Sequence, residues 1–380
     1  LGSTMEARSR FLVGFHDAPG YAVGDAYDGH RVVAVDEDLR FIVVETSAVD
    51  ALRLKALGDA SVRYLESDES DHRLHLVPND ALWNDPGMYG ARIIGAPLAW
   101  DVTTGSTAVK VAHIDSGVRR THEDLAGGRV LQGYDFYNND PEPDDHTYCF
   151  FHGTHTIGTT GATLNNGKGI AGLSLHTILP VKIFQGKSPS FFNGCPTTTT
   201  AIVNALKYAA DQGSHVSSNS WGGGSFSTAI DDAITYAHNK GTIHVASAGN
   251  SGPCTNCVGN PWKAAPTRSI IVSASNQNDQ FALTWSGSTG GSSEGPEVDV
   301  MAPGDDILSL KGDADNSYRY MDGTSMAAPH VSGVAALVKA LNPSFTFADV
   351  EARIKGTAVD RGETSDRQGA GRLSASAAVY

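Results

Sequence analysis

Three short segments constrain this 380-residue chain more than any other feature. Each places a polar side chain, Asp115, His152 or Ser325, beside glycine and other small residues. Small neighbours let a substrate backbone approach the polar group closely. The order Asp, His, Ser along one chain therefore predicts a serine-hydrolase triad. Written out, the segments are Val111–Gly117, His152–His155 and Gly323–His330.

The amino-acid composition limits the classes of protein to which this chain can belong. Hydrophobic residues make up 40% of the chain, enough for one large α/β domain and a smaller one. No apolar run reaches the roughly 18 to 20 residues that a membrane-spanning helix needs. The formal charge of -14 argues against a nucleic-acid partner, because such binding usually needs a basic face. We therefore expect neither a membrane span nor nucleic-acid binding.

The first part of the chain predicts a small α+β domain over residues 10–76. Short β-prone runs alternate with turn residues, and one run opens with a capping serine and stops before Gly58, as a helix does. Residues 1–9 are expected to be a vector-derived or disordered start, which leaves room for a lost signal peptide. The expected strands are 11–15, 31–35, 41–45 and 62–65, with a helix at 47–57.

Residues 77–380 predict a second, larger domain. An acidic, polar segment at 66–73 leads into it as an exposed connection. Apolar strands then alternate with amphipathic helices, which is typical of an α/β fold with a mainly parallel central sheet. The expected strands are 109–114, 177–183, 216–219, 242–246 and 270–273, and the clearest helices are 200–211 and 228–238.

The polar side chains fall at the ends of these expected elements. Asp115 ends an apolar strand, at the edge where open α/β sheets form ligand crevices. Ser325 is a weak nucleophile unless His152 removes its proton, and Asp115 would fix the tautomer of that imidazole. The predicted oxyanion donors are the backbone N–H of Ser325 and the side chain of Asn250, which follows another strand.

The same residues also allow other interpretations. Any one of these residues alone would more often be a turn former or a helix cap. His152 and His155 could instead bind a metal, but no third ligand accompanies them. We therefore expect no catalytic metal, and we interpret His113, His155 and His330 as packing or hydrogen-bonding residues.

The three segments, together with Ala248–Asn250, resemble the signature blocks of the subtilisin-like serine proteases, the subtilase family. Similar segments extend over most of residues 77–380, and Val77–Asp80 resembles the mature start of the thermitase-like branch. The resemblance implies a three-layer subtilisin-like fold and an endopeptidase that forms an acyl-enzyme on Ser325. Proteins and peptides would be its substrates, and we expect a monomer.

The same resemblance implies a substrate-binding cleft. Its edge and pocket segments contain no charged residue, which predicts a large apolar or aromatic residue before the scissile bond. The residues implied are Ser220, Trp221, Gly222, Gly223, Ser247, Ala248, Gly249 and Gly259.

The domain at 10–76 resembles the family's N-terminal propeptide, a ferredoxin-like α+β chaperone and inhibitor that self-cleavage separates from the enzyme. Cleavage is expected between Leu74 and Val77. In one departure, a Gly-, Pro- and Asp-rich stretch at 16–29 stands where the family usually has a helix between the first two strands. An ordinary accessory domain is the open alternative.

Calcium is the cation that the resemblance implies. Hard cations take carboxylate, amide and backbone oxygens, and six positions match a family site that ties the mature N-terminus to a loop. Such a site would stabilise the fold and take no part in catalysis. Each residue alone could equally be a solvated turn residue. The six are the side chains of Asp80, Asp124 and Asn166 and the main-chain oxygens of Leu164, Lys168 and Ile170.

Four cysteines permit three pairings if all are oxidised. Cys254 and Cys257 form a CxxC motif, and without a second such motif a small loop staple is favoured over zinc or redox chemistry. The resemblance puts Cys149 and Cys195 on two loops at the rim of the cleft and so favours their pairing. Disulfides indicate an oxidising compartment, and we expect a secreted protein.

Two rival functions stay open at this point. The first is a binding protein with the subtilase fold and no turnover, which the intact Asp115, His152, Asn250 and Ser325 argue against. The second is an esterase or peptide ligase that uses the same acyl-enzyme. Relative activity on ester and peptide substrates, with and without an amine acceptor, would discriminate between them.

Overall fold

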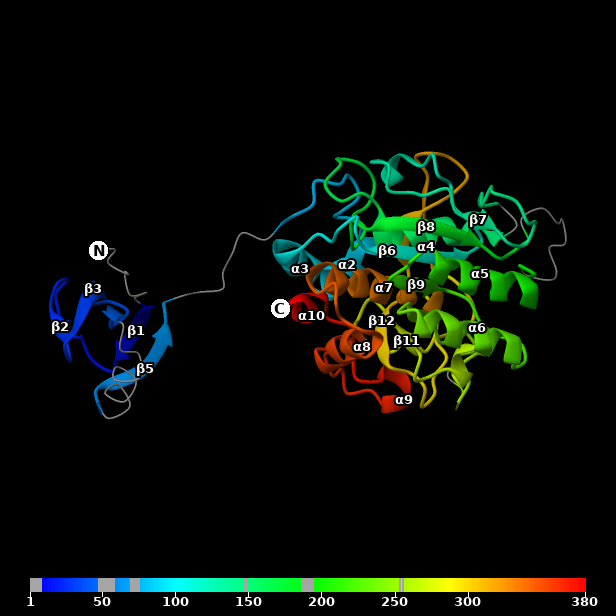
Figure 1. Ribbon diagram of the computed structural model, residues 1–380. Coiled ribbons are helices and arrows are strands. Elements are labelled where there is room, and N and C mark those ends of the chain that lie inside the picture. Colours follow the sequence, from blue (N-terminus) through cyan, green and yellow to red (C-terminus); the bar gives the residue numbers. More distant parts are fainter. Residues whose placement is uncertain are drawn as a thin grey trace, which may run out of the picture. The chain divides into compact units, whose positions relative to one another are not determined.

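Two compact units make up the chain, Leu1–Leu74 and His75–Tyr380 (Figure 1). The computed structural model describes residues 9–46, 59–68, 76–146, 149–185, 195–252, 254 and 256–380. Within these ranges, no helix combines the length and the apolar character that crossing a bilayer requires.

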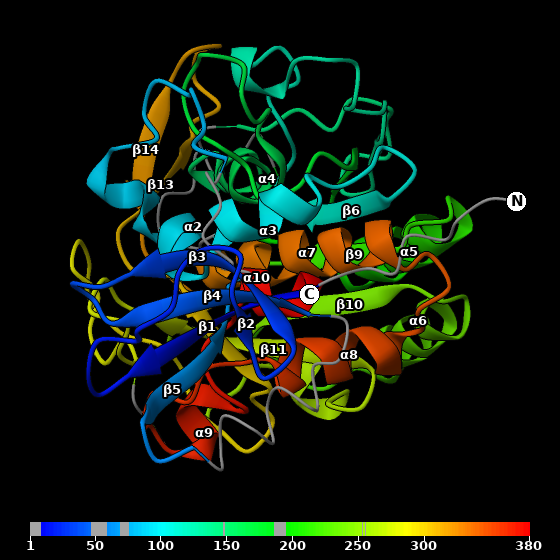
Figure 2. The same cartoon turned by 90° about the vertical axis from the view of Figure 1, so that its left-hand side faces the viewer.

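The first unit is a five-stranded antiparallel sheet in the order β2-β3-β4-β1-β5, drawn in blue in Figure 2. Its buried side chains include Val13, Val32, Ile42 and Val44. The four expected strands are present, whereas the helix expected at 47–57 lies outside the described residues. The bounds are β1 (Ser9–Phe15), β2 (Ala26–Tyr27), β3 (His30–Asp36), β4 (Phe41–Thr46) and β5 (Val62–Ser67).

A hairpin occupies part of the stretch at 16–29 for which no helix was expected. The short strand β2 turns into β3 through Asp28 and Gly29. Both residues have positive φ, 48° and 83°. This is the backbone that a two-residue hairpin requires and that an Asp-Gly pair adopts readily.

The second unit contains a seven-stranded sheet whose paired strands all run parallel. The strand order is β12-β11-β10-β9-β6-β8-β7. The five strands expected here are confirmed to within about two residues at each end, and the short strands β7 and β12 were not expected. The bounds are β6 (Lys110–Asp115), β7 (Tyr134–Asp135), β8 (Thr177–Lys182), β9 (Val216–Asn219), β10 (Ile243–Ser247), β11 (Ser269–Ser275) and β12 (Val300–Pro303).

Helices cover both faces of this sheet, so the expected three-layer α/β fold is confirmed (Figure 1). Successive strand residues belong to opposite cores: Val111 and Val245 pack in one cluster, and Ala112 and Ala246 pack in the other. This follows from the two-residue side-chain period of a strand. The helices are α2 (Tyr89–Ile93), α3 (Ala96–Val102), α4 (His152–Gly161), α5 (Thr199–Asp211), α6 (Thr228–Asn239), α7 (Thr324–Leu341), α8 (Phe347–Gly356), α9 (Ser365–Gln368) and α10 (Ala375–Val379).

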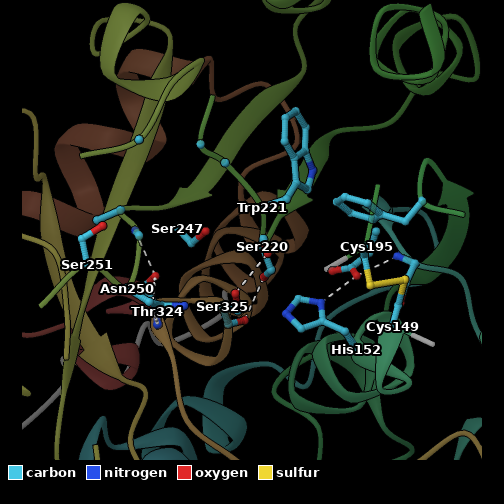
Figure 3. Close-up of a pocket in the computed structure, with 18 of the residues that line it drawn as sticks. Cys149, His152, Cys195, Ser220, Trp221, Ser247, Asn250, Ser251, Thr324 and Ser325 are labelled. Atoms are coloured by element: carbon cyan, nitrogen blue, oxygen red, sulfur yellow. Dashed lines mark hydrogen bonds and ion pairs between the residues drawn. A yellow bond between two sulfur atoms is a disulfide. The ribbon is translucent and has the colours of Figure 1, made fainter. Parts of the chain in front are cut away.

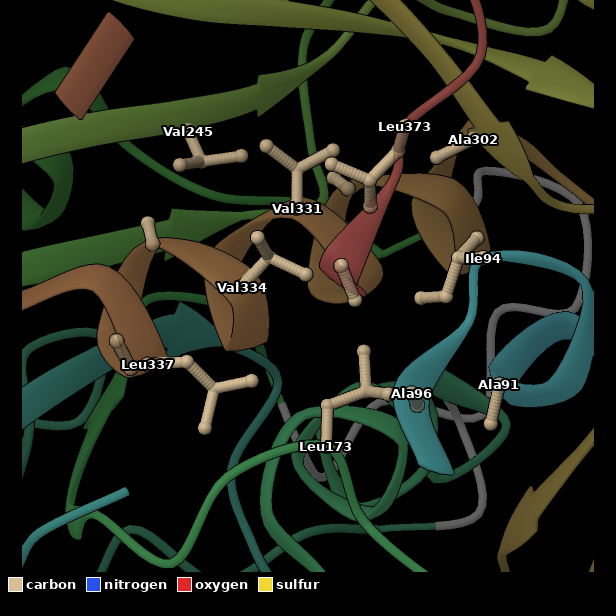
Figure 4. Packing of buried hydrophobic residues seen from close by; sticks show 14 of the residues in the cluster. Ala91, Ile94, Ala96, Leu173, Val245, Ala302, Val331, Val334, Leu337 and Leu373 are labelled. Carbon is tan, nitrogen blue, oxygen red and sulfur yellow. The ribbon is translucent and has the colours of Figure 1, made fainter. Parts of the chain in front are cut away.

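Helix α7 runs through the first of these cores, where Val331, Val334 and Leu337 pack around its axis (Figure 4). Its small residues allow close neighbours, since a Cβ on Gly333 would lie 2.7 Å from that of Leu173. Truncating a fully buried side chain such as Leu337 to alanine typically costs about 2 to 5 kcal/mol. This rigid packing fixes the start of α7, where Ser325 lies.

The chain reverses its direction of winding beside β6, which pairs with β8 on one side and β9 on the other. Open α/β sheets place ligand crevices at such a switch point, beyond the carboxyl ends of the strands. Asp115 is the last residue of β6. A separate hairpin, which was not expected, consists of β13 (Ile307–Leu310) and β14 (Tyr318–Met321).

Candidate active site

Asp115 and His152 form a hydrogen-bonded pair at this edge of the sheet. The distance from His152 Nδ1 to Asp115 Oδ1 is 2.7 Å, and only 2% of Asp115 is exposed. An ionised carboxylate can only accept, so Nδ1 donates and Nε2 remains free to accept a proton from a hydroxyl. Asp115 is itself held by the N–H of Ser116 at 2.7 Å and the hydroxyl of Thr156 at 3.2 Å.

The pKa of His152 reflects two opposing effects. Burial lowers this pKa, whereas the negative charge of Asp115 and the hydrogen bond to it raise it. The carboxylate outweighs burial, so the pKa lies above the ordinary value of 6.5. An imidazole whose charged form is stabilised by a carboxylate is suited to take up a proton during a reaction and return it.

Ser325 is the second residue of helix α7 and faces the same space. Figure 3 shows the imidazole of His152 turned toward Ser325. The Ser325 hydroxyl donates to the carbonyl oxygen of Ser220 at 3.1 Å, and the Ser220 hydroxyl donates back to the Ser325 carbonyl at 2.8 Å. The nucleophile candidate is therefore within the cleft, and a rotation about its Cα–Cβ bond would redirect Oγ toward His152.

Asn250 is oriented by a residue that the sequence analysis missed. Its Oδ1 accepts from the N–H of Thr324 at 2.9 Å and from the Thr324 hydroxyl at 3.0 Å. The same hydroxyl accepts from the N–H of Gly249 at 3.0 Å. These bonds fix Oδ1 as the accepting end of the amide, so that Nδ2 is available to donate toward a developing oxyanion.

A second buried carboxylate, that of Asp145, forms hydrogen bonds with residues next to Asp115 and His152. Asp145 accepts from the hydroxyl of Ser116 at 2.8 Å and from the N–H and hydroxyl of Thr154 at 2.8 and 2.7 Å. Burial raises the pKa of Asp145, and the hydrogen bonds lower it in part. Ser116 also accepts from the N–H of Gly153, beside His152, at 2.8 Å. No pattern in the sequence singled out Asp145.

A cleft of about 380 Å³ is lined by Asp115, His152, Asn250 and Ser325. All eight residues expected to bind substrate also line it, from Ser220–Gly223, Ser247–Gly249 and Gly259. The charged or titratable side chains in the lining are Asp115 and His152. Cys149 and Cys195, expected at the rim, also line the cleft, and the lining residues that were not expected are Ser116, Phe150, Phe184, Ser251, Cys257 and Thr324.

The cysteines pair as Cys149 with Cys195 and Cys254 with Cys257. The first disulfide joins two chain segments separated by 46 residues, beside His152 (Figure 3). The histidines interpreted as packing residues are indeed buried: His113 and His330 are 2% exposed and His155 is 0% exposed. The Nε2 of His155 lies 3.1 Å from the carbonyl oxygens of Ile307 and Arg319.

The structure brings together the side chains expected to bind calcium. Asp80 accepts from the N–H of Asn165 at 3.0 Å, and Asp124 accepts from the side-chain amide of Asn166 at 2.7 Å and the N–H of Ile170 at 2.9 Å. The loop that contains Asn166 also contains the other expected ligands, Leu164, Lys168 and Ile170. No group of three or more His, Cys, Asp or Glu side chains suited to a metal occurs among the described residues.

Comparisons with known proteins agree with this site. The subtilase family model (peptidase S8) matches residues 106–371. Thermitase from Thermoactinomyces vulgaris is 38% identical over 304 residues, which cover 80% of this chain and 99% of thermitase. A thermophilic serine proteinase from a Bacillus species (strain AK1) is 39% identical, over 79% of this chain and 68% of the relative.

Two further similarities extend the comparison. Halolysin from Haloferax mediterranei is 34% identical over 96% of this chain and 67% of its own length. A solved structure of a protease from Pseudoalteromonas arctica superposes with a TM-score of 0.68 at 30% identity, covering 80% of this chain and 99% of that chain. The chain therefore belongs to the subtilase family, with thermitase-like relatives. It is a subtilisin-like serine endopeptidase.

Proposed function

We propose that Ser325 is the nucleophile, His152 the general base and Asp115 the orienting carboxylate of this endopeptidase. The observation that carries the proposal is the 2.7 Å hydrogen bond between Asp115 and His152, in a cleft where the imidazole faces Ser325. Asn250 Nδ2 and the N–H of Ser325 are the proposed oxyanion donors.

The reaction follows from these roles. His152 Nε2 takes the hydroxyl proton as Ser325 Oγ bonds to the carbonyl carbon of the substrate. The carbonyl oxygen becomes negative and accepts hydrogen bonds from Asn250 and the Ser325 N–H. His152 then gives its proton to the leaving amine, the C–N bond breaks and an acyl-enzyme remains. Water, deprotonated by His152, attacks this ester and releases the acid.

Specificity is proposed to come from the glycine-lined part of the cleft. Gly222, Gly249 and Gly259 leave room for a side chain, and the described residues of that part include no charged side chain that would pair with an ionised residue. We expect substrates with a large apolar or aromatic residue before the scissile bond. Peptides that carry phenylalanine or leucine there should be cleaved faster than those that carry aspartate or lysine.

The test of the activity compares the parent chain with Ser325→Ala on peptide, ester and peptide-plus-amine substrates. The parent should hydrolyse peptides, and the variant should lose nearly all of this activity. Ser288→Ala, a change at an exposed serine, is the matched control and should keep it. Ester hydrolysis without peptide cleavage would favour the esterase alternative, amide synthesis would favour the ligase, and binding without turnover would favour the inactive binding protein.

We also propose that residues 10–76 are a propeptide that the enzyme at 77–380 removes from itself. The division of the chain into compact units after Leu74 supports this, and the halolysin similarity extends over most of the chain. Intact mass over time should show the parent splitting between Leu74 and Val77 while Ser325→Ala stays whole. Splitting of both chains alike would assign the cut to another protease.

A calcium ion at Asp80 and Asp124 is proposed to stabilise the fold. These carboxylates are 4% and 0% exposed, and burial raises the pKa of both, to about 6 for Asp124, with a further rise from the charge of Asp80. The lysine of the adjoining loop, Lys168, pairs with Glu123 instead, at 3.2 Å. Two buried, mutually repelling carboxylates with this donor set fit a hard divalent cation, which would neutralise them.

Chelation tests this ion. Removing calcium from the parent should lower the melting temperature, and adding it back should restore it; a ligand at 100 to 1,000 times its Kd stabilises by about 3 to 4 kcal/mol. Asp124→Asn should abolish the response, whereas Asp211→Asn, at an exposed site, should keep it. A melting temperature indifferent to calcium would contradict the proposal.

Secretion is the last part of the proposal. Both disulfides would persist in an oxidising compartment and would be reduced in most cytosols. Protein recovered from the medium of its native producer should therefore show no free thiol on alkylation under denaturing conditions. Recovery only inside the cell, with four reactive thiols, would contradict it.

A further inference from the structure

Helix α4, which begins at His152, is bonded to the hairpin β13–β14, a contact that the proposed mechanism does not use. The hydroxyl of Ser309 in β13 donates to the carbonyl oxygen of His155 at 2.7 Å. The Nε2 of His155 lies 3.1 Å from one carbonyl oxygen in each strand, those of Ile307 and Arg319. Carbonyl oxygens only accept, so Nε2 carries the proton and donates to both. Three residues after His152, the helix is therefore tied to both strands of the hairpin.

The two residues before His152 form a turn that costs conformational energy. Phe150 and Phe151 both have left-handed φ, 56° and 55°, a conformation that bulky residues rarely adopt. Strained backbone of this kind persists where surrounding contacts enforce it. The side chain of Phe150 is 57% exposed, so packing of its ring contributes little to holding the turn. The enforcing contacts are therefore made by the backbone of the turn and by Phe151.

The hairpin contacts both residues of this turn. The guanidinium of Arg319, in β14, donates to the carbonyl oxygen of Phe150 at 3.1 Å. A hydrogen bond from a charged donor is roughly twice as strong as one between neutral groups. Between the two strands, Gly312 lies so close to the turn that a Cβ on it would be 2.6 Å from Cδ1 of Phe151. The hairpin thus bonds the carbonyl of one phenylalanine and covers the ring of the other.

Two other constraints act on the same turn. The N–H of Phe151 donates to the carbonyl oxygen of His146 at 3.3 Å, and Cys149 is joined to Cys195 by the first disulfide. Neither constraint involves the carbonyl oxygen of Phe150. The bond from Arg319 is the one that fixes the direction of this carbonyl, and with it the peptide plane that leads into α4.

The turn determines where the imidazole of His152 lies, because His152 follows it directly as the first residue of α4. A rotation of the peptide unit after Phe150 would displace the start of the helix relative to Asp115 and Ser325. The 2.7 Å bond between His152 and Asp115 requires that this start stays in place. Misplacement of a reacting group by about 1 Å can cost about 100-fold in rate.

We propose that Arg319 is a positioning residue for His152, which it holds in place through the carbonyl oxygen of Phe150. This inference rests on the proposed peptidase function. Arg319 is not among the residues that line the cleft, so it acts on the reaction through the turn and not by contact with the substrate.

The charge of Arg319 has a second effect that can be measured separately. Burial and this charge lower the pKa of His152, whereas the charges of Asp115 and Asp145 raise it. His155 faces His152 from the next turn of α4 and is neutral, because burial lowers its pKa to about 3. Loss of the charge should therefore move the acid limb of activity to higher pH, and loss of the hydrogen bond should lower kcat on the plateau. A glutamine can donate the bond without the charge.

The test measures kcat and KM for a peptide substrate from pH 5 to pH 10, with active enzyme counted by titration with a serine-directed sulfonyl fluoride. Arg319→Ala should lower the plateau kcat about 10- to 100-fold and change KM less than about threefold. Arg319→Gln should keep kcat within about threefold of the parent, since it restores the donor. Both variants should raise the pH midpoint by the same amount, about a few tenths of a unit, whereas Arg319→Lys should leave the midpoint unchanged.

Two further variants assign the loss to the turn. Arg353→Ala is the matched control, because Arg353 also donates to a carbonyl oxygen, that of Ala378 at 3.0 Å, away from the cleft lining. It should keep the parental kcat and midpoint. Phe150→Asn introduces a residue that adopts left-handed backbone more readily, so the loss caused by Arg319→Ala should shrink to about threefold or less in that background.

Melting temperatures confirm that each variant is folded. If Arg319→Ala does not fold, Arg319→Met takes its place, because it keeps the aliphatic stem and removes both the donor and the charge. The expected kcat, KM and midpoint are the same for either variant.

The outcomes separate this inference from the function on which it rests. Parental kcat in Arg319→Ala overturns the positioning role and leaves the peptidase function standing. A loss that Arg319→Gln shares in full assigns the effect to charge and overturns the role as well. An equal loss with and without Phe150→Asn shows that the arginine does not act through the turn, which also overturns it. A parent chain that cleaves no peptide overturns both proposals.

Discussion

Two histidine sites in the second unit have pKa values that move in opposite directions. His152 is bonded to Asp115, and its pKa lies above the ordinary value. His113 and His176 instead stack on each other, with ring centroids 5.7 Å apart and Nε2 atoms 3.4 Å apart. Burial lowers the pKa of His113 to about 3 and that of His176 well below its ordinary value.

The difference lies in the partner, because burial lowers the pKa at both sites. A carboxylate compensates the lost hydration of an imidazolium, whereas a second imidazole adds repulsion if either becomes charged. His113 lies only two residues before Asp115, the partner of His152, on β6. Histidine sites with pKa values shifted in opposite directions therefore lie close together in the fold. Asp115 therefore favours the protonated form of His152, whereas the stacked pair stays neutral and stabilises the fold by packing.

The strongest test of the comparison removes the carboxylate. Asp115→Asn should lower kcat by about 10⁴, because the amide no longer favours the tautomer or the charge of His152 that the reaction needs. Steady-state kinetics with active-site titration would measure this. Asp211→Asn removes a carboxylate from an exposed ion pair with Lys207 and Lys240 and should leave kcat unchanged. A loss of less than tenfold in Asp115→Asn would refute the role given to Asp115.

The next largest effect concerns Asn250, whose charge stabilisation is independent of the proton on His152. Asn250→Ala should lower kcat by about 10² to 10³ with little change in KM, because the donor acts mainly on the developing oxyanion. Thr324→Val keeps the amide but removes one of its orienting bonds, and should cost less. An equal rise in KM for Asn250→Ala would indicate ground-state binding instead.

The stacked pair should make the fold sensitive to acid. Its pKa values are lowered in the folded state, so the unfolded chain binds more protons, and stability falls as pH drops from 6.5 toward 3. Each such imidazole contributes a slope of about 1.4 kcal/mol per pH unit in this window. Urea unfolding from pH 7 to pH 4 should show a shallower slope for His113→Val than for the parent. Equal slopes would show that the pair does not titrate on unfolding.

The smallest expected effect is on the pH profile of activity. Because Asp115 raises the pKa of His152, kcat/KM should fall to half its plateau at a pH above 6.5 and decline tenfold per unit below it. Peptide hydrolysis from pH 5 to pH 9 measures this midpoint. His113→Val should leave the midpoint within a few tenths of a unit. A midpoint well below 6.5 would mean that burial outweighs the carboxylate.

Much of the fold was predictable because its signals are local. The apolar runs at 109–114 and 242–246 and the helical spacing at 200–211 are patterns among residues close together in the sequence. The stretch at 16–29 shows the limit of such signals: its three glycines and its one proline, Pro19, argued against a helix, while the Asp28-Gly29 hairpin became evident only in the structure. Short strands such as β12 carry too few residues for a periodic pattern.

In the candidate site, too, the residues with a local sequence signal were predictable and the others were not. Asp115, His152, Asn250 and Ser325 were predictable because each lies in a motif of small residues with a chemical reason for its place. Asp145 was not, since an aspartate in an acidic loop carries no signal until burial removes its water and Thr154 and Ser116 bond to it. The orientation of Asn250 by Thr324 joins residues 74 positions apart.

The sequence by itself determined the α/β class, the order of the proposed triad side chains and the family, because these depend on residue types and on spacing along the chain. Only the tertiary structure decided which further groups are neighbours: Asp145 beside Ser116 and Thr154, His113 on His176, and Thr324 beside Asn250. Such contacts depend on how whole helices and strands pack, and packing sums many weak interactions over the entire core. It also sets the local dielectric, and so the direction in which each buried pKa moves.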